Sequence, residues 1–180
     1  MKSFLSFLWE TAKIFIIALV IVVPIRYFLF QPFFVKGASM DPNFADGQYL
    51  IIDEISYRFQ EPARGEVVVF KYPYDTSQRY IKRIIGLPGE DIKIKDGKVF
   101  IADKVLDESA YLSADTVTAG SLEITLGSNE YFVMGDNRLA SSDSRRWGPV
   151  SRENIIGRVA LRAWPFATLT QFEHPALSNQ

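Results

Sequence analysis

The sequence predicts a mainly β protein in which one antiparallel β-sheet domain follows a single N-terminal transmembrane helix. Three observations carry this prediction. The first 30 residues are largely apolar, short β-branched or aromatic runs recur between turn signals in the remaining chain, and these runs do not form a βαβ array. A chain of 180 residues suits one domain of ordinary size. We therefore expect three regions. Residues 1–30 form the N-terminal cytoplasmic end and the transmembrane anchor, residues 31–172 an extracytoplasmic β-rich domain, and residues 173–180 a tail.

The predicted anchor depends on the run I-F-I-I-A-L-V-I-V-V-P-I between Lys13 and Arg26. A membrane crossing needs about 20 mostly apolar residues, so flanking residues must contribute, with charged side chains reaching toward the headgroups. Trp9 and Tyr27 suit the two interfaces. A cleaved signal peptide and a buried soluble helix are alternatives, but the aromatic block F-L-F-Q-P-F-F that follows favours an interfacial belt. Lysine and arginine are nearly balanced on the two sides, so charge alone does not fix the orientation.

The remaining chain contains a series of candidate strands. We expect them at residues 49–52, 66–72, 79–85, 130–134 and 155–164. The run I-K-I-K-D-G-K-V-F-I predicts a hairpin, because Asp96-Gly97 suits the positive backbone angles of a two-residue turn. The polar segment 107–121 predicts a surface loop, and the residues after Phe172 predict a frayed tail.

Composition excludes several classes of function. A net charge of −1 gives no electrostatic footprint for nucleic acid. The absence of cysteine removes thiol nucleophiles, disulfides and cysteine-ligated metals. The one histidine, His174, lies in the C-terminal tail, so an imidazole relay or a histidine-rich metal site would depend on one terminal residue. We therefore expect no metal, no cofactor and no nucleic-acid partner.

A serine and a lysine are the candidate reactive groups. The stretch V-K-G-A-S-M-D-P places Ser39 in a loop of small residues, and the bases left to activate it are carboxylates or a lysine of lowered pKa. Lys82 lies in R-Y-I-K-R-I-I, where strand alternation puts Tyr80 and Ile84 on its own face. Burial among apolar groups can lower a lysine pKa by about 3–5. The alternatives are a lysine whose amine reaches water and a serine that only shapes a turn.

A third motif, G-D-N-R-L-A-S-S-D-S-R from Gly135 to Arg145, follows one of the predicted strands. Together with the apolar segment, S-M-D-P at Ser39–Pro42 and Y-I-K-R-I-I-G-L-P-G-E at Tyr80–Glu90, it resembles the type I signal peptidases. These are membrane-bound serine proteases that remove signal peptides from exported proteins. The motifs occur in the family's order from the anchor to about Val150. S-M-x-P alone is weak, whereas the lysine and G-D-N-R motifs in this order are highly specific.

The resemblance implies a β domain of signal-peptidase type and a Ser-Lys dyad that acts through an acyl-enzyme. Ser39 would be the nucleophile and Lys82 the general base. Ser141 would hydrogen-bond and orient the lysine, while Asp143 and Arg145 would brace the site. The resemblance further implies preprotein substrates cut after small residues, and a single-pass location in the plasma membrane with the catalytic domain on the extracytoplasmic face.

Some features depart from the family or leave alternatives open. Gly37 stands where many members carry a serine that donates to the oxyanion, so the second donor is unassigned. Aromatic residues that could lie against the lipid bilayer, or simply pack in the core, are Phe33, Phe34, Trp164 and Phe166. Other functions are a specialised precursor peptidase of the pilin type and a membrane-tethered β module that binds partners without chemistry. A self-cleaving repressor of the LexA type shares the Ser-Lys chemistry but begins with a DNA-binding domain.

Overall fold

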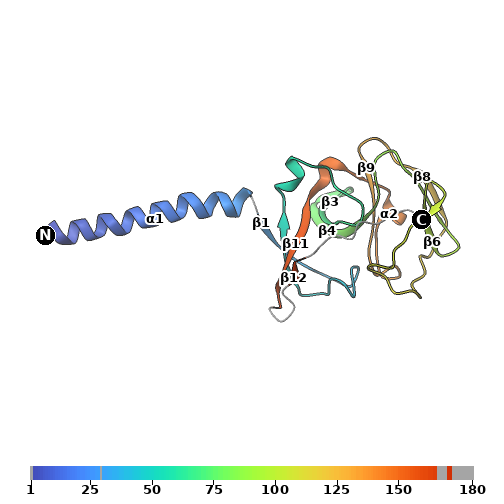
Figure 1. Cartoon of the computed structure of the whole chain (residues 1–180), viewed down its shortest axis with the longest axis horizontal. Coiled ribbons are helices and arrows are strands. Elements are labelled where there is room, and N and C mark those ends of the chain that lie inside the picture. The colour runs from blue at the N-terminus through green and yellow to red at the C-terminus, as the bar shows by residue number, and fades with distance from the viewer. Residues whose placement is uncertain (1, 29, 166–169, 172–180) are drawn as a thin grey trace.

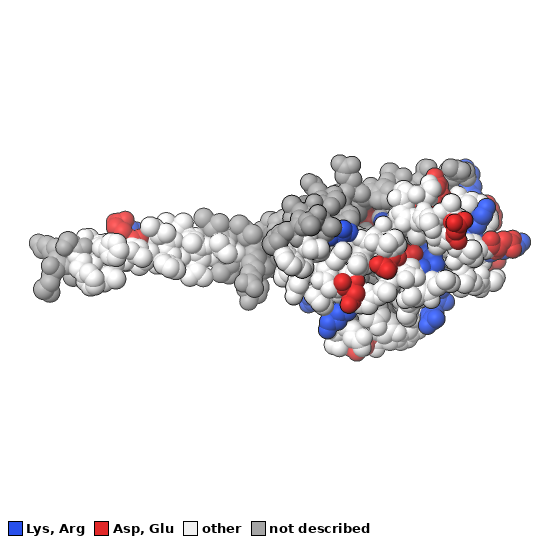
Figure 2. Space-filling view, turned by 90° about the horizontal axis from the view of Figure 1, so that it is seen from below, with Lys and Arg blue, Asp and Glu red and all other residues white. Residues whose placement is uncertain are grey.

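The computed structural model describes residues 2–28, 30–165 and 170–171, which form one long helix followed by β structure (Figure 1). Helix α1 (Lys2–Phe28) projects away from the β domain, and apolar side chains on it such as Phe15 and Val20 are exposed. Of the part of its surface that Figure 2 does not draw in grey, most is uncharged, and the charge lies in the region that holds the Glu10–Lys13 ion pair. Within the described residues, no helix combines the length and the hydropathy that a membrane crossing requires. The single-pass anchor therefore stays a prediction.

The larger of two antiparallel sheets carries most of the domain. Its described strands run in the order β1 (Phe30–Phe34), β2 (Tyr49–Asp53), β11 (Ile155–Trp164), β3 (Val67–Tyr72), β4 (Asp75–Gly86), β9 (Glu130–Met134) and β10 (Val150–Ser151), with β12 (Thr170–Gln171) paired to β11. Strand β4 lies between β3 and β9 and is therefore paired on both sides at residue Arg83. The predicted mainly antiparallel β fold is confirmed.

The smaller sheet has the order β7 (Lys104–Val105), β6 (Lys98–Ile101), β5 (Asp91–Lys95) and β8 (Leu122–Thr125). Its central hairpin turns at Asp96 and Gly97, with φ of 49° and 76°. Positive φ at both turn residues is what a two-residue hairpin of the primed type requires, so the hairpin prediction is confirmed. Short helical turns complete the described structure: η1 (Ser56–Arg58), α2 (Ser144–Trp147) and η2 (Arg152–Asn154).

Three apolar clusters form the core, and β4 contributes to each of them; one of the three joins the larger sheet to the smaller one. Ile81 packs with Met40 and other residues of the first cluster, Ile84 with Phe70 in the second, and Ile85 in the third, which underlies the smaller sheet. Every residue from 81 to 86 is buried. A strand that is paired on both edges and packed on both faces is the most rigid position that this fold offers.

The five strand predictions agree with β2, β3, β4, β9 and β11. Strand β1 was not expected, because Pro32 indicates the end of a regular element. In the structure, β1 is an edge strand of the larger sheet, and there the N–H that proline lacks is not needed for pairing. The predicted loop 107–121 is irregular, but it is fastened to the domain by buried Tyr111 and Thr118. The predicted tail at 173–180, with His174, lies outside the described residues, as does Phe166.

Candidate active site

Ser39 lies on a loop that is held from both ends. The Val35 N–H donates to the Gln48 carbonyl at 2.9 Å, and Met40 is fully buried. Gly37 has φ of +82°, a conformation that favours glycine, and its N–H donates to Asp46 Oδ1 at 2.6 Å. The loop therefore presents Ser39 at its surface while the flanking residues are fixed. The amide of Gly37 is already bonded to a carboxylate, so it is not free to serve as a second oxyanion donor.

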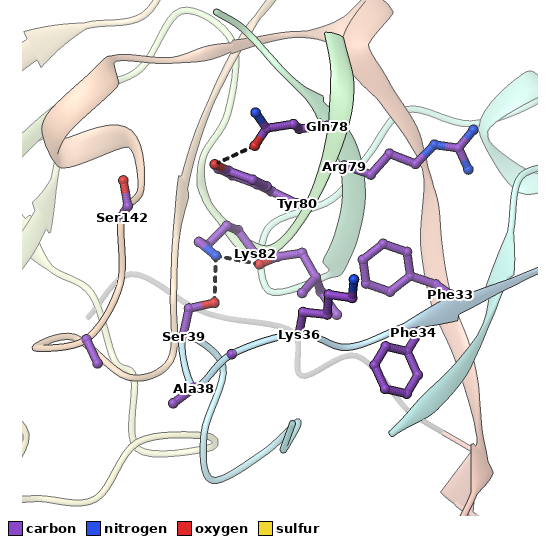
Figure 3. Close-up of a pocket in the computed structure, with 13 residues that line it drawn as sticks. Phe33, Phe34, Lys36, Ala38, Ser39, Gln78, Arg79, Tyr80, Lys82 and Ser142 are labelled. Atoms are coloured by element: carbon purple, nitrogen blue, oxygen red, sulfur yellow. Dashed lines mark hydrogen bonds between the residues drawn. The ribbon is translucent and has the colours of Figure 1, made fainter. Parts of the chain in front are cut away.

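Lys82 comes from the middle of β4 and points toward Ser39 (Figure 3). Its Nζ lies 2.7 Å from Ser39 Oγ and donates to the Ile81 carbonyl at 2.8 Å. The Tyr80 ring centroid is 5.7 Å from Nζ, in agreement with the strand alternation that put both side chains on one face. Only 4% of Lys82 is exposed. A residue 43 positions from Ser39 in the chain is thus in hydrogen-bond contact with it.

Burial dominates the electrostatics of Lys82. Desolvation of the ammonium lowers its pKa from 10.5 to about 8, because the charged form loses water that its neighbours do not replace. The negative charges of Asp143 and Asp136 act in the opposite direction and are too weak to cancel the effect of burial. Near neutral pH, a usable fraction of the amine is therefore neutral and able to accept a proton.

Ser141 is buried beside the dyad, against Gly135. A Cβ built on Gly135 would lie 2.2 Å from Ser141 Oγ and 2.4 Å from the Ser39 carbonyl oxygen, so only glycine fits between these two serines. The expected hydrogen bond from Ser141 to the lysine is not formed: among the described residues, Ser141 Oγ has no hydrogen-bond partner of good geometry. The hydroxyl lies close enough to the Asp143 carboxylate to help lower the pKa of that group.

Asp143 and Arg145 brace the loop after β9. The Asp143 carboxylate accepts hydrogen bonds from Arg145 Nε at 2.8 Å and from the Gly135 N–H at 3.0 Å. Burial alone would raise the pKa of this carboxyl, but these bonds outweigh it and hold the pKa below its usual range. Arg145 also donates to the Arg138 carbonyl at 2.8 Å. The pair therefore fixes both ends of the segment that carries Ser141.

A second ion pair links this segment to β4 and to the Ser39 loop. Arg83 donates to both carboxylate oxygens of Asp136, at 2.8 and 2.6 Å, and both side chains are buried. Asn43 Nδ2 donates to the same carboxylate at 2.8 Å, and the Asn137 N–H donates to the Ser39 carbonyl at 3.1 Å. Asp136 and Asn137 thus join the three chain segments that form the site.

An open groove of about 580 Å³ runs beside the dyad, and we call it the dyad groove (Figure 3). Its walls come from β1, the Ser39 loop, β4 and the segment after Asn137. The residues that line it include Phe33, Phe34, Ala38, Tyr80 and Ala140, with the dyad at its floor. Small side chains next to Ser39 leave room for an extended peptide. In the part of the chain that the structure describes, no cluster of His, Asp and Glu side chains could hold a metal ion.

Sequence reasoning missed the contacts that depend on distant residues. Asp46 was not singled out, since nothing in the sequence signals a bond to Gly37 nine positions away. In the sequence, Gly135 stands out only as part of the G-D-N-R motif, although its lack of a side chain is what lets Ser141 approach. Chemically, the arrangement offers a hydroxyl beside an amine of lowered pKa, which suits nucleophilic attack on a carbonyl.

Comparison with known proteins shows the family of the chain. The family model described as signal peptidase, peptidase S26, matches residues 8–164. Probable signal peptidase I-2 of Synechocystis sp. is 37% identical over 162 residues, which cover 87% of this chain and 73% of the relative. Signal peptidase I V of Bacillus subtilis is 35% identical over 157 residues, covering 81% and 92%. A solved signal peptidase I from Enterococcus faecalis V583 is 30% identical, with a TM-score of 0.49, and covers 56% of this chain and 97% of that chain. The chain belongs to the signal peptidase family, peptidase S26.

Proposed function

We propose that this protein is a serine endopeptidase that removes N-terminal signal peptides from exported preproteins, with Ser39 as nucleophile and Lys82 as general base. The observation that carries the proposal is the 2.7 Å separation of Lys82 Nζ and Ser39 Oγ at a lysine that is 4% exposed. A solvated lysine would be protonated at neutral pH and unable to act as a base. Membership of the signal peptidase family supports the same activity and substrate class.

In the reaction, neutral Lys82 accepts the Ser39 proton while Oγ attacks the peptide carbonyl. The Ser39 N–H supplies one hydrogen bond to the resulting oxyanion. The Lys82 ammonium then gives its proton to the departing amine, which leaves an ester between Oγ and the signal peptide. Water attacks that ester with Lys82 again as base, and this releases the signal peptide and restores the serine. The Ile81 carbonyl accepts from Nζ at 2.8 Å and so orients the amine throughout.

Asp143, Arg145 and Ser141 act as supporting residues in this proposal. The Asp143–Arg145 pair holds the backbone at Gly135 in place, and that glycine lies against both serines. The buried Ser141 hydroxyl packs against Gly135 and helps to lower the pKa of the Asp143 carboxyl, so it supports the loop beside the dyad. None of the three takes part in proton transfer.

We further propose that residues 1–30 anchor the protein in the bilayer as a single pass, with the domain at 31–172 on the extracytoplasmic side. The support is the projecting α1 with exposed apolar side chains, which the β domain does not cover (Figure 1). Extraction of membranes at alkaline pH tests the anchor: the full chain should stay in the pellet. Recovery in the supernatant would contradict it.

The activity is tested by incubating the full chain in detergent with a model precursor and reading the new N-terminus by mass. The expected result is a cut after a small residue, lost by at least about a thousandfold in Ser39→Ala and Lys82→Ala. Lys71→Ala, which removes an exposed lysine from neighbouring β3, is the matched control and should retain activity. Folded Lys82→Ala with full activity would overturn the mechanism.

A further inference from the structure

A second open groove borders the catalytic loops. Its volume is about 510 Å³, and apolar side chains that line it are Pro42, Leu112, Val117 and Leu139. Asp41 and Asp115 line it as well, and both are exposed. We call it the acidic groove. Loop 107–121, which supplies one wall, connects to the smaller sheet at the end of the domain far from α1 (Figure 1).

Two chain segments separate the acidic groove from the dyad groove, and each segment contributes residues to both. Asp41 and Pro42 follow the nucleophile directly, and Leu139 lines the acidic groove while its neighbour Ala140 lines the dyad groove. The Asn137 N–H, bonded to the Ser39 carbonyl at 3.1 Å, ties the two segments together. Since two residues span at most about 7 Å, Asp41 lies within two or three extended residues of the bond that Ser39 attacks.

The exposed charges of the two grooves are opposite in sign. The dyad groove carries exposed Lys36 and Arg79. In the acidic groove, the described arginine, Arg138, is 3% exposed and its guanidinium donates to Glu108 and Thr118. The buried Asp136 carboxylate is likewise paired with a guanidinium. Asp41 and Asp115 therefore set the sign of the potential that a peptide meets there.

The two grooves give the two halves of a bound precursor separate places. The dyad groove is lined by Phe33 and Phe34 of β1, which directly follows α1. A signal segment held near the bilayer would leave along that side. The chain beyond the cut must then continue past Ser39 in the other direction, where Pro42 and Leu139 offer an apolar floor and the two carboxylates a rim.

We propose that the acidic groove binds the first residues of the mature chain, and that it selects basic over acidic side chains at the second or third position after the cut. This inference rests on the proposed function. Carboxylates that are exposed and not used by the fold attract a lysine or arginine and repel a glutamate. Because the charges are exposed, the preference is expected to be modest, about three- to tenfold in kcat/KM between lysine and glutamate.

The test uses three peptide substrates that are identical up to the cut and carry Lys, Gln or Glu at the second and third mature positions. The wild-type full chain in detergent should cleave the Lys peptide fastest, the Gln peptide more slowly and the Glu peptide slowest. In 0.5 M salt the Debye length is about half its value at physiological ionic strength, so the differences in rate should become smaller. The double variant Asp41→Asn/Asp115→Asn should lose most of the preference. The double variant Asp103→Asn/Glu153→Gln makes the same change in net charge outside both grooves and should keep the preference.

The outcomes separate this inference from the activity itself. Cleavage of all three peptides at equal rates, or a preference that Asp41→Asn/Asp115→Asn leaves unchanged, would overturn the acidic groove as a subsite while the peptidase activity stands. Loss of the preference in the control variant as well would show a general charge effect and would also overturn it. Failure to cleave any of the peptides would overturn the proposed function and this inference with it.

Discussion

The pH dependence of cleavage should be set by how well Tyr80 keeps water from Lys82. The base must be neutral to accept the Ser39 proton, so kcat/KM should rise with pH and level off above the lysine pKa of about 8. We call this rising part of the pH profile the limb. At pH 7, about one tenth of the amine is then neutral. The difference between 10.5 and about 8 corresponds to roughly 3 kcal/mol in favour of the neutral form.

Tyr80 is the side chain to change, because its ring lies 5.7 Å from Lys82 Nζ while its hydroxyl bonds Gln78 and not the lysine. The ring is itself stacked on Tyr72, with centroids 4.8 Å apart. Tyr80→Ala should admit water and raise the pKa of Lys82. A rise of about one pH unit lowers kcat/KM about tenfold at pH 7 and has little effect at pH 10. Tyr80→Phe keeps the ring and should keep the limb near pH 8.

The assay is the initial rate of cleavage of one peptide at low substrate concentration, measured between pH 6 and pH 10.5 for the wild type and both variants. Tyr80 also lines the dyad groove, so Tyr80→Ala can change peptide binding; that effect lowers the rate at every pH and leaves the limb in place. An unshifted limb in Tyr80→Ala would refute the assignment of the limb to a lysine kept neutral by burial.

Three further changes test the site. Lys82→Met should abolish cleavage yet raise the free energy of unfolding by about 1–3 kcal/mol at pH 7, because the variant no longer buries an ammonium. This gain in stability should fade between pH 8 and 10.5, where the lysine of the wild type becomes neutral in the folded state, and denaturant titration at pH 7 and at pH 10.5 checks this. Gly135→Ala should lower kcat by about a hundredfold, because its Cβ would lie 2.4 Å from the Ser39 carbonyl oxygen, and unchanged kinetics would contradict the close packing. Asp136→Asn should cost about 3–5 kcal/mol of stability in urea unfolding, since it leaves the buried Arg83 guanidinium without its carboxylate; a loss below 1 kcal/mol would mean that the pair is not needed.

Much of the fold was predictable because its signals are local. Strand alternation placed Tyr80 on the face of Lys82, and Asp96-Gly97 marked its hairpin without any knowledge of the rest of the chain. Strand β1 was missed for a local reason too: Pro32 indicates a break, and only its position at a sheet edge makes it compatible with a strand. The irregular segment 107–121 gave no sign that Tyr111 would pack under the guanidinium of Arg83, 4.1 Å from its ring centroid.

The sequence by itself determined the chemical types available: a hydroxyl in a loop of small residues, a lysine in an apolar strand, and neither cysteine nor a histidine outside the tail. Only the tertiary structure decided that Lys82 Nζ would lie 2.7 Å from Ser39 Oγ and lose its water, and that one carboxylate would bond Asn43 from 93 positions away. The physical reason is range. Backbone propensity and side-chain alternation are set by neighbours along the chain, whereas a separation between side chains and the solvation of an amine are set by whatever the fold packs around them.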